Sequence, residues 1–505
     1  MLRARAPAGL RGRVIPSPSL RLSIWIDRNP RACFGAFALL HAAVWTILPT
    51  FLYPNLPLDL IEALTYGREW QLGYDKLPPL PWWLVEIVYR LGGGDFAYYF
   101  VAQLCVLAAF ALVWATALPL VGAAGALASV LIVDGLHYFN FTAPKFNHDV
   151  MQLPFWALAG FSFHAALRTG RLLYWAYLGL VLGLAVWAKY FVVALAVPLA
   201  LFLLFDSRAR QALTRPGPYL AAIIAVLIAA PHLSWLIEND FLPFNYASAR
   251  AAESRGFLDR ILHPLFFATA QLFWFLPSLL IALPLLKARR DATPSGFDRR
   301  VISLLTFGPA AFLLAMSMLS GRALITMWGY PLWLFAGLWI VMELKARLDG
   351  GRLARMIAIW GGVTAVYALA FIAHYAVLPN FDTRYRASLF PGDAIARELT
   401  DRFRAATGHS PAYVISEMWV GGNISHYAPA RPRVLIDGSP SRAPWIDLAD
   451  LRKRGAIVAW TGETSNIPEA YAPIAGNAVV QPPISFPFRR GNNSVTVGWA
   501  IVKPQ

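Results

Sequence analysis

The chain carries a succession of long apolar stretches, each long enough to cross a lipid bilayer. A helix needs about 20 apolar residues to span the hydrocarbon core, and the sequence holds about eleven such stretches. They lie near residues 31–53, 96–120, 122–138, 150–167, 172–188, 190–205, 218–237, 264–286, 301–320, 323–343 and 354–378. Hydrophobic residues make up 58% of the 505 residues and charged residues only 14%, which excludes a soluble globular protein.

Positive charges are concentrated in alternate connections between these stretches. Lys and Arg cluster in five segments: 1–30, 168–171, 208–215, 287–300 and 345–355. With eleven spans the five segments share one side, and Lys and Arg in short loops mark the cytoplasmic side. We therefore expect residues 1–30 to form a basic cytoplasmic arm, and the C-terminal tail to lie outside. The other outward segments are 54–95, 139–149, 238–262 and 321–322.

The net charge of +16 is explained largely by this topology and by attraction to anionic headgroups. It therefore requires no nucleic acid as a partner.

After about residue 380 the pattern changes from long apolar runs to short β-type runs. These are AYVISEMW (412–419), RVLIDG (433–438), AIVAWTG (456–462) and SVTVGWAIV (494–502). Residues 394–407 have helical spacing, and Gly and Pro punctuate the remainder. The expected fold class is an α-helical polytopic membrane protein, with a transmembrane domain over 31–379 and a small soluble α/β domain over 380–505.

The first outer loop, at 54–95, gathers charged and aromatic side chains beside the membrane. They are Asp59, Glu62, Arg68, Glu69, Asp75 and Lys76, with Trp70, Trp82 and Trp83, whose rings suit the membrane interface. If 58–70 is helical, Asp59, Glu62 and Tyr66 lie on one face, because residues three or four apart are neighbours. A plainer interpretation of Asp59 is helix capping beside a solvated face.

The carboxylates of this loop favour a functional role, because a carboxylate beside lipid costs free energy unless it is paired or hydrated. Asp59 is suited to act as a general base toward an attacking hydroxyl. Lys76, and then Arg68, are the first candidates among the nearby cations to stabilise a departing phosphate, since both residue types bind phosphate. The alternative for Lys76 is that its ammonium reaches toward the headgroups.

Further outward positions carry polar side chains that suit a cavity. Lys145 and His148 precede Asp149 at the start of a span, Lys189 lies in a turn between two spans, and His232 lies near the end of another. A lysine between apolar spans has few structural explanations, so we expect Lys189 to line a site. The histidines lack the spacing of a metal site and are more often structural. No cofactor is predicted with certainty; assistance by a divalent metal stays open.

The first loop resembles that of a known family of membrane enzymes. LDLIEALTYGREWQLGYDKLPPLPWWL (58–84) has an acidic residue at its start, a second soon after, and a Gly-Tyr-Asp-Lys turn before a Pro pair. This pattern resembles bacterial family-39 glycosyltransferases, C-type enzymes related to protein O-mannosyltransferases and to lipid A aminoarabinose transferases. FNHDVMQLPFWAL (146–158), AKYFVV (188–193) and SGRALITMWGYPLW (320–333) resemble later segments of the family. Leu77 departs from it, since many relatives have His before the Pro pair.

The resemblance implies an integral-membrane glycosyltransferase that uses a polyprenyl-phosphate-linked sugar on the periplasmic side of the bacterial inner membrane. Asp59 would be the catalytic carboxylate, and Glu62 would help to position it or the sugar. The residues expected to bind the donor phosphate are Lys76, Arg68 and Lys189. Those expected to line the cavity are Tyr66, Asp75, Lys145, His148, Asp149 and His232. The acceptor, whether lipid A or another lipopolysaccharide part, another glycolipid or a protein, stays open, and transfer would invert the anomeric configuration.

Two other classes of function stay open. A transporter of a lipid-linked or anionic substrate explains the spans and outer cations equally well, because intramembrane charges also mark translocation paths. It explains the acidic loop and the outer domain less well, and the sequence has no obvious inverted repeat. The second alternative is a structural scaffold with the tail as its binding module. Alanine at Asp59 separates these classes, since only an enzyme loses transfer while it still binds the carrier.

Overall fold

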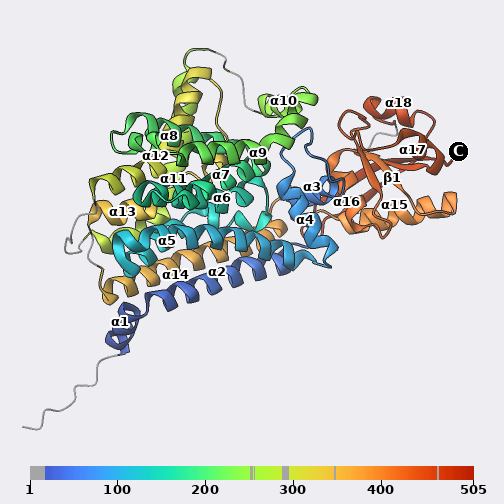
Figure 1. Cartoon of the computed structure of the whole chain (residues 1–505). Coiled ribbons are helices and arrows are strands. Elements are labelled where there is room, and N and C mark those ends of the chain that lie inside the picture. Colours follow the sequence, from blue (N-terminus) through green and yellow to red (C-terminus); the bar gives the residue numbers. More distant parts are fainter. Residues whose placement is uncertain (1–17, 251–253, 255, 287–294, 346–347, 463–465) are drawn as a thin grey trace, which may run out of the picture.

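The computed structural model has a helical part and a smaller α/β part that lie end to end (Figure 1). It describes residues 18–250, 254, 256–286, 295–345, 348–462 and 466–505. The α/β part, residues 380–505, is called the C-terminal domain below, and α1 lies at the opposite end of the molecule. Residues 1–17 of the expected N-terminal arm lie outside the described residues, and the rest of the arm is largely helical in α1.

Apolar helices make up the helical part, in agreement with the predicted fold class. In chain order the helices are α1 (Pro18–Arg28), α2 (Pro30–Leu52), α3 (Leu58–Gly67), α4 (Leu80–Arg90), α5 (Asp95–Asp134), α6 (His148–Thr169), α7 (Leu172–Ala188), α8 (Val193–Phe205), α9 (Gly217–Glu238), α10 (Leu242–Arg250), α11 (Asp259–Ala282), α12 (Gly296–Ser320), α13 (Ala336–Leu344) and α14 (Gly350–Ile372). Helices suit a bilayer because they satisfy their backbone N–H and C=O groups internally.

Seven helical segments of the described chain are long and apolar enough to cross a membrane: α2, α5, α6, α9, Asp259–Leu285, α12 and Gly350–Asn380. The segments Leu172–Ala188 and Tyr190–Phe205 are apolar but shorter. The predicted total of about eleven crossings therefore also requires that α7, α8, α13 and both halves of α5 cross.

The helix α5 bends at a glycine. A straight helix of its 40 residues would measure about 60 Å, twice the thickness of the hydrocarbon core. Gly122 has φ of 71° and ψ of 175°, a conformation that is essentially restricted to glycine. It lies at the predicted boundary between the spans at 96–120 and 122–138, so one residue explains why the two runs meet at an angle.

The C-terminal domain is built on one five-stranded sheet. Its strands are β1 (Tyr413–Ser416), β2 (Arg433–Ile436), β3 (Ala456–Thr461), β4 (Val479–Pro487) and β5 (Ser494–Val502), and its helices are α15 (Gly392–Thr407), α16 (Met418–Tyr427), α17 (Leu448–Arg454) and α18 (Ala472–Ala475). The strand order is β2-β1-β3-β5-β4; the first three are parallel, while β5 is antiparallel to β3 and β4. This confirms the predicted α/β domain, with β4 as a strand that the sequence did not reveal.

The C-terminal domain is docked on one end of the helical part (Figure 1). Helix α16 packs against α3 of the first loop. Arg490 of the domain donates hydrogen bonds to the carbonyl oxygens of Leu52, at 3.2 Å, and Tyr375, at 3.0 Å. These carbonyls belong to the end of α2 and to the continuation of α14, where helical C=O groups lack partners within the helix. The domain therefore caps the membrane helices.

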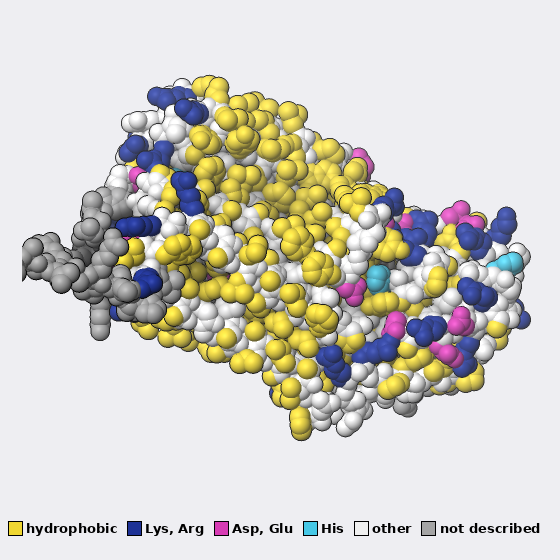
Figure 2. Space-filling view, turned by 90° about the horizontal axis from the view of Figure 1, so that it is seen from below, with side chains coloured by type: hydrophobic (Ala, Val, Ile, Leu, Met, Phe, Trp, Pro, Cys, Tyr) yellow, Lys and Arg dark blue, Asp and Glu magenta, His cyan; other side chains and the backbone are white. Residues whose placement is uncertain are grey.

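The surface of the helical part is mainly hydrophobic (Figure 2). Leu39, Phe51 and Phe205 are each at least 73% exposed. Exposure of such large apolar side chains costs free energy in water but not in lipid. Lys and Arg gather at the end farthest from the C-terminal domain, and both signs of charge cover that domain. This distribution agrees with a membrane-embedded belt between two aqueous ends.

Replacing Gly122 by alanine tests whether the bend depends on glycine. We expect Gly122→Ala to lower the free energy of unfolding by about 1–3 kcal/mol, because its backbone conformation is strained for any other residue. Gly361 in α14 is the matched control, since a methyl group there meets no other atom within 4 Å. Gly361→Ala should stabilise the protein by about 0.5–1 kcal/mol. Thermal unfolding in detergent measures both, and equal effects would contradict this account.

Candidate active site

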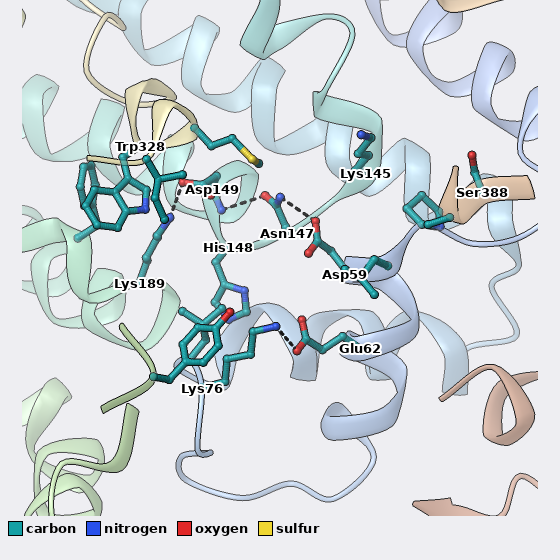
Figure 3. A pocket seen from close by; sticks show the side chains of 18 of the residues that line it. Asp59, Glu62, Lys76, Lys145, Asn147, His148, Asp149, Lys189, Trp328 and Ser388 are labelled. Atoms are coloured by element: carbon teal, nitrogen blue, oxygen red, sulfur yellow. Dashed lines mark hydrogen bonds and ion pairs between the residues drawn. The ribbon is translucent and has the colours of Figure 1, made fainter. Parts of the chain in front are cut away.

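A cavity of about 640 Å³ lies where the helical part meets the C-terminal domain (Figure 3). Its walls come from α3, the turn after it, the segment before α6, the turn between α7 and α8, α10, the segment before α13 and the linker after α14. The predicted site residues that line it are Asp59, Glu62, Lys76, Lys145, His148, Asp149 and Lys189. Residues from three parts of the chain that the sequence singled out separately therefore meet in one place.

Asp59 lies in the first turn of α3, at the cavity wall. The unpaired N–H groups and the dipole at a helix start favour negative charge there. Its Oδ2 accepts a hydrogen bond of 3.1 Å from Nδ2 of Asn147. Among the described residues, no Lys, Arg or His forms an ion pair with it. Asp59 is therefore a half-buried carboxylate that no cation of the described chain contacts directly, although its charge acts on the nearby Lys76.

Asn147 joins two parts of the site. Its side-chain oxygen accepts hydrogen bonds from the N–H groups of Asp149, at 3.0 Å, and Val150, at 3.1 Å, and so caps α6. Its amide group is the donor to Asp59. The same side chain thus fixes the start of α6 and the orientation of Asp59.

Glu62 lies one helical turn after Asp59 and faces the same cavity, as its spacing predicted. Its Oε1 is 2.5 Å from Nζ of Lys76, and both side chains are largely buried. Burial raises the pKa of Glu62, although the Lys76 ammonium opposes that shift. Burial alone would lower the pKa of Lys76, because it disfavours the charged ammonium. The attraction of the Glu62 carboxylate outweighs this effect, so the pKa of Lys76 is raised. The pair places an ammonium at the cavity wall.

A second ion pair lies across the cavity (Figure 3). Nζ of Lys189 is 2.5 Å from Oδ1 of Asp149, and Nε2 of Gln152 donates to the same oxygen at 3.0 Å. Lys189 ends α7, at the turn that the sequence predicted. Both ionised side chains are about nine-tenths buried, so each needs the other to offset the loss of water.

Lys145 differs from these two lysines. It ends a short helical turn just before α6 and is half-buried at the cavity. No carboxylate of the described chain lies within ion-pair distance of its ammonium, and no dashed line reaches it in Figure 3. His148 lines the cavity nearby, and its Nε2 donates to the carbonyl oxygen of Pro78 at 2.9 Å. This bond holds the turn after Lys76 against the start of α6.

The linker to the C-terminal domain closes one side of the cavity. Arg386, Ser388 and His374 line it, although the sequence had not singled them out. Nη1 and Nη2 of Arg386 grip both oxygens of Asp382, at 2.7 and 2.9 Å. No sequence signal marks Arg386 and Ser388, because the linker has no regular pattern, while His374 belongs to the helical continuation of α14. Asn147 was detectable, since an Asn before an apolar run is a helix-start signal.

Three predicted site residues of the first loop lie outside the cavity. Tyr66 stacks on Trp82, with ring centroids 4.3 Å apart, and donates from its hydroxyl to Oδ1 of Asp75 at 2.8 Å. Asp75 pairs instead with Nε of Arg442 at 2.7 Å. Arg68 donates to the backbone carbonyls of Arg431 and Pro432. These side chains do not line the cavity, because their partners belong to the C-terminal domain or to the loop's own aromatic core.

His232 lies one layer behind the cavity. Its Nδ1 donates to the carbonyl oxygen of Leu72 at 2.6 Å, so its Nε2 accepts from the Tyr190 hydroxyl at 2.9 Å. Tyr190 lines the cavity in its place. Within the described chain, no three His, Cys, Asp or Glu side chains are grouped so that they could hold a metal ion.

Comparisons with known proteins agree with this architecture. Residues 76–235 match the family model of dolichyl-phosphate-mannose-protein mannosyltransferase. No curated protein sequence matches the chain. The crystal structure of ArnT from Cupriavidus metallidurans bound to undecaprenyl phosphate is similar, with a TM-score of 0.63 and 15% identity over 94% of this chain and 98% of that one. The apo structure of the same protein gives a TM-score of 0.62 and 15% identity, over 93% and 97%.

The shared fold extends over nearly the whole of both chains, including the C-terminal domain, and the family match starts at Lys76 in the first loop. Together they show that this chain has the fold of ArnT, and the partial family match agrees with the resemblance that the first loop showed.

Proposed function

We propose that the chain is a membrane glycosyltransferase that moves a sugar from a polyprenyl-phosphate carrier to a hydroxyl acceptor, with Asp59 as the general base. The observation that carries the proposal is the charge pattern of the cavity. Glu62 and Asp149 are each occupied by a lysine, whereas Asp59 has only the neutral amide of Asn147. Asp59 is therefore the cavity carboxylate that is available to take a proton from a substrate.

The cations of the cavity suit a phosphate leaving group. Lys76 and Lys189 each engage one carboxylate oxygen, which leaves the remaining N–H donors of both ammonium groups for a ligand. Lys145 adds a charge that no carboxylate of the described chain offsets. We assign the phosphate to Lys145 together with Lys76 and Lys189. Arg68 is omitted because it binds backbone carbonyls outside the cavity.

The transfer step follows from these roles. The acceptor oxygen forms a bond to the anomeric carbon, and its proton passes to a carboxylate oxygen of Asp59. The bond between the anomeric carbon and the phosphate oxygen breaks, and its electron pair leaves with the polyprenyl phosphate. The lysine ammonium groups stabilise the charge that develops on that phosphate. Attack opposite to the leaving group inverts the configuration.

Apolar side chains of the cavity suit the lipid part of the donor. Ile325, Met327 and Trp328 line it on the segment before α13, and Leu58 and Leu77 line it from the first loop. A prenyl chain gains free energy by packing against such a wall, about 25 cal/mol for each Å² removed from water. The site therefore has an apolar surface for the prenyl chain beside a charged surface for the phosphate.

The relatives support a lipid-linked donor. One similar structure is described as bound to undecaprenyl phosphate, and the matching family is described by its dolichyl-phosphate-mannose donor. We propose the inner membrane of a bacterium as the location, with the cavity on the periplasmic side and the N-terminus in the cytoplasm. The acceptor is a lipopolysaccharide part, another glycolipid or a protein hydroxyl.

A transporter of lipid-linked substrates remains the second candidate function, since it too needs cations beside an apolar wall. The free carboxylate at position 59 favours the enzyme, because a path for an anion gains nothing from an additional unpaired negative charge. A flux assay in vesicles separates the two functions: movement of a polyprenyl phosphate between leaflets by the Asp59→Asn variant at the wild-type rate supports a transporter.

Replacing the base tests the proposed chemistry. We expect Asp59→Asn to lower transfer by about 10²–10⁴-fold, because general base catalysis contributes that much, and to leave the binding of polyprenyl phosphate intact. Mass spectrometry of envelope glycolipids and proteins from cells with and without the active chain measures transfer and identifies the recipient. Asp240→Asn is the control, since Asp240 is exposed and does not line the cavity. Unchanged transfer by the Asp59 variant would rule out this mechanism.

Replacing Lys145 tests the assignment of the phosphate. We expect Lys145→Gln to weaken the binding of polyprenyl phosphate by about 10–100-fold, since a hydrogen bond to a charged group contributes about 1.5–3 kcal/mol. Thermal stability should be unchanged, because no protein carboxylate loses a partner. Lys453→Gln, at an exposed position on α17, controls for overall charge. Wild-type affinity in Lys145→Gln would show that the other lysines suffice.

A further inference from the structure

Three arginines of the C-terminal domain reach carboxylates of the first loop. Arg431 pairs with Glu86 through both guanidinium nitrogens, at 3.1 and 2.6 Å. Arg433 pairs in the same way with Glu69. The third pair joins Arg442 to Asp75. Each pair links residues more than 340 positions apart. These ion pairs therefore hold the C-terminal domain against the first loop.

The third pair differs from the others by its place in the loop. Asp75 is the residue before Lys76, whose ammonium lies at the cavity wall. Oδ2 of Asp75 accepts from Nε of Arg442 at 2.7 Å, and its Oδ1 accepts from the Tyr66 hydroxyl at 2.8 Å. Both oxygens are thus held from outside the cavity. Glu69 and Glu86 lie seven and ten positions from Lys76 and have no such link to it.

Arg442 is itself fixed by the sheet of the C-terminal domain. Its Nη1 donates to Asp437, which directly follows β2. The carboxyl ends of parallel strands are the edge at which open α/β sheets bind ligands. Trp445, three residues after Arg442, packs edge-on against Tyr66 and Tyr74, with ring centroids 5.9 and 5.6 Å apart. The edge is therefore occupied by the turn that carries Lys76.

We propose that Arg442 is a positioning residue that sets the place of Lys76 through Asp75, so that the sheet of the C-terminal domain controls the phosphate site without lining the cavity. The proposal rests on the proposed function, since it takes Lys76 as a ligand of the donor phosphate. The backbone between Asp75 and Lys76 has few degrees of freedom once Asp75 is held at both oxygens. A small shift of Lys76 would separate it from the phosphate, and a misplacement of about 1 Å can cost up to 100-fold in a reaction.

The test compares two arginines of the same interface. Full-length Arg442→Gln and Arg433→Gln are placed in lipid nanodiscs, and their affinity for undecaprenyl phosphate and their thermal stability are measured. Each variant loses one ion pair between the domain and the loop, and Arg442→Gln also loses its pair with Asp437, so we expect both variants to lose thermal stability. Only Arg442→Gln should weaken binding, by about tenfold or more. Asp75→Asn removes the same pair from the other side and should reproduce the weaker binding.

A double-mutant cycle separates positioning from a general loosening of the fold. If Arg442 acts through Lys76, Arg442→Gln should have little further effect on binding in a Lys76→Gln background. Arg442→Lys should restore part of the affinity, since one hydrogen bond to Asp75 can form. Equal losses of affinity in Arg442→Gln and Arg433→Gln, or additive effects in the cycle, would overturn the positioning role while the proposed function stands. Failure of the wild-type chain to bind undecaprenyl phosphate would overturn both.

Discussion

The loss of water around ionised groups at the membrane boundary is the constraint on which this site depends. A buried charge is costly unless it is paired and hydrogen-bonded, and removing one partner leaves the other at full cost. The cavity meets this constraint with local pairs, Glu62 with Lys76 and Asp149 with Lys189. In this cavity, Asp59 and Lys145 form no ion pair with another residue of the described chain. They are therefore the groups for which a charged or polar ligand can supply the missing interaction.

The pairs also explain why the site needs the whole fold. Glu62 and Lys76 both come from the first loop, but Asp149 begins α6 and Lys189 ends α7. Asn147 then connects the second pair to the first loop through its bond to Asp59. Each connection depends on how helices separated by tens of residues pack together. A rigid scaffold of apolar helices is what holds the polar groups of the loops in fixed positions.

The sequence was sufficient for the parts that depend on local pattern. Apolar runs of membrane length predicted the helices, and the spacing of Asp59 and Glu62 predicted their shared face. The sequence did not show that Arg68 and Asp75 turn away from the cavity, because the groups that hold them lie more than 360 positions away, which no local period encodes. Strand β4 escaped detection because its segment carries three prolines; it lies at the sheet edge, where proline is tolerated.

The position of the C-terminal domain follows from the chemistry of the first loop. The loop that carries Asp59 and Lys76 includes non-helical residues between α3 and α4. Ordering the backbone of each of these residues costs about 1–2 kcal/mol of conformational entropy. The loop's own aromatic stack of Tyr66 and Trp82 supplies part of the compensation. The domain supplies more by packing Trp445 against that stack and by giving Asp75 a cationic partner in Arg442. The domain therefore acts as a second wall that lets a polar loop remain ordered at the edge of an apolar bundle.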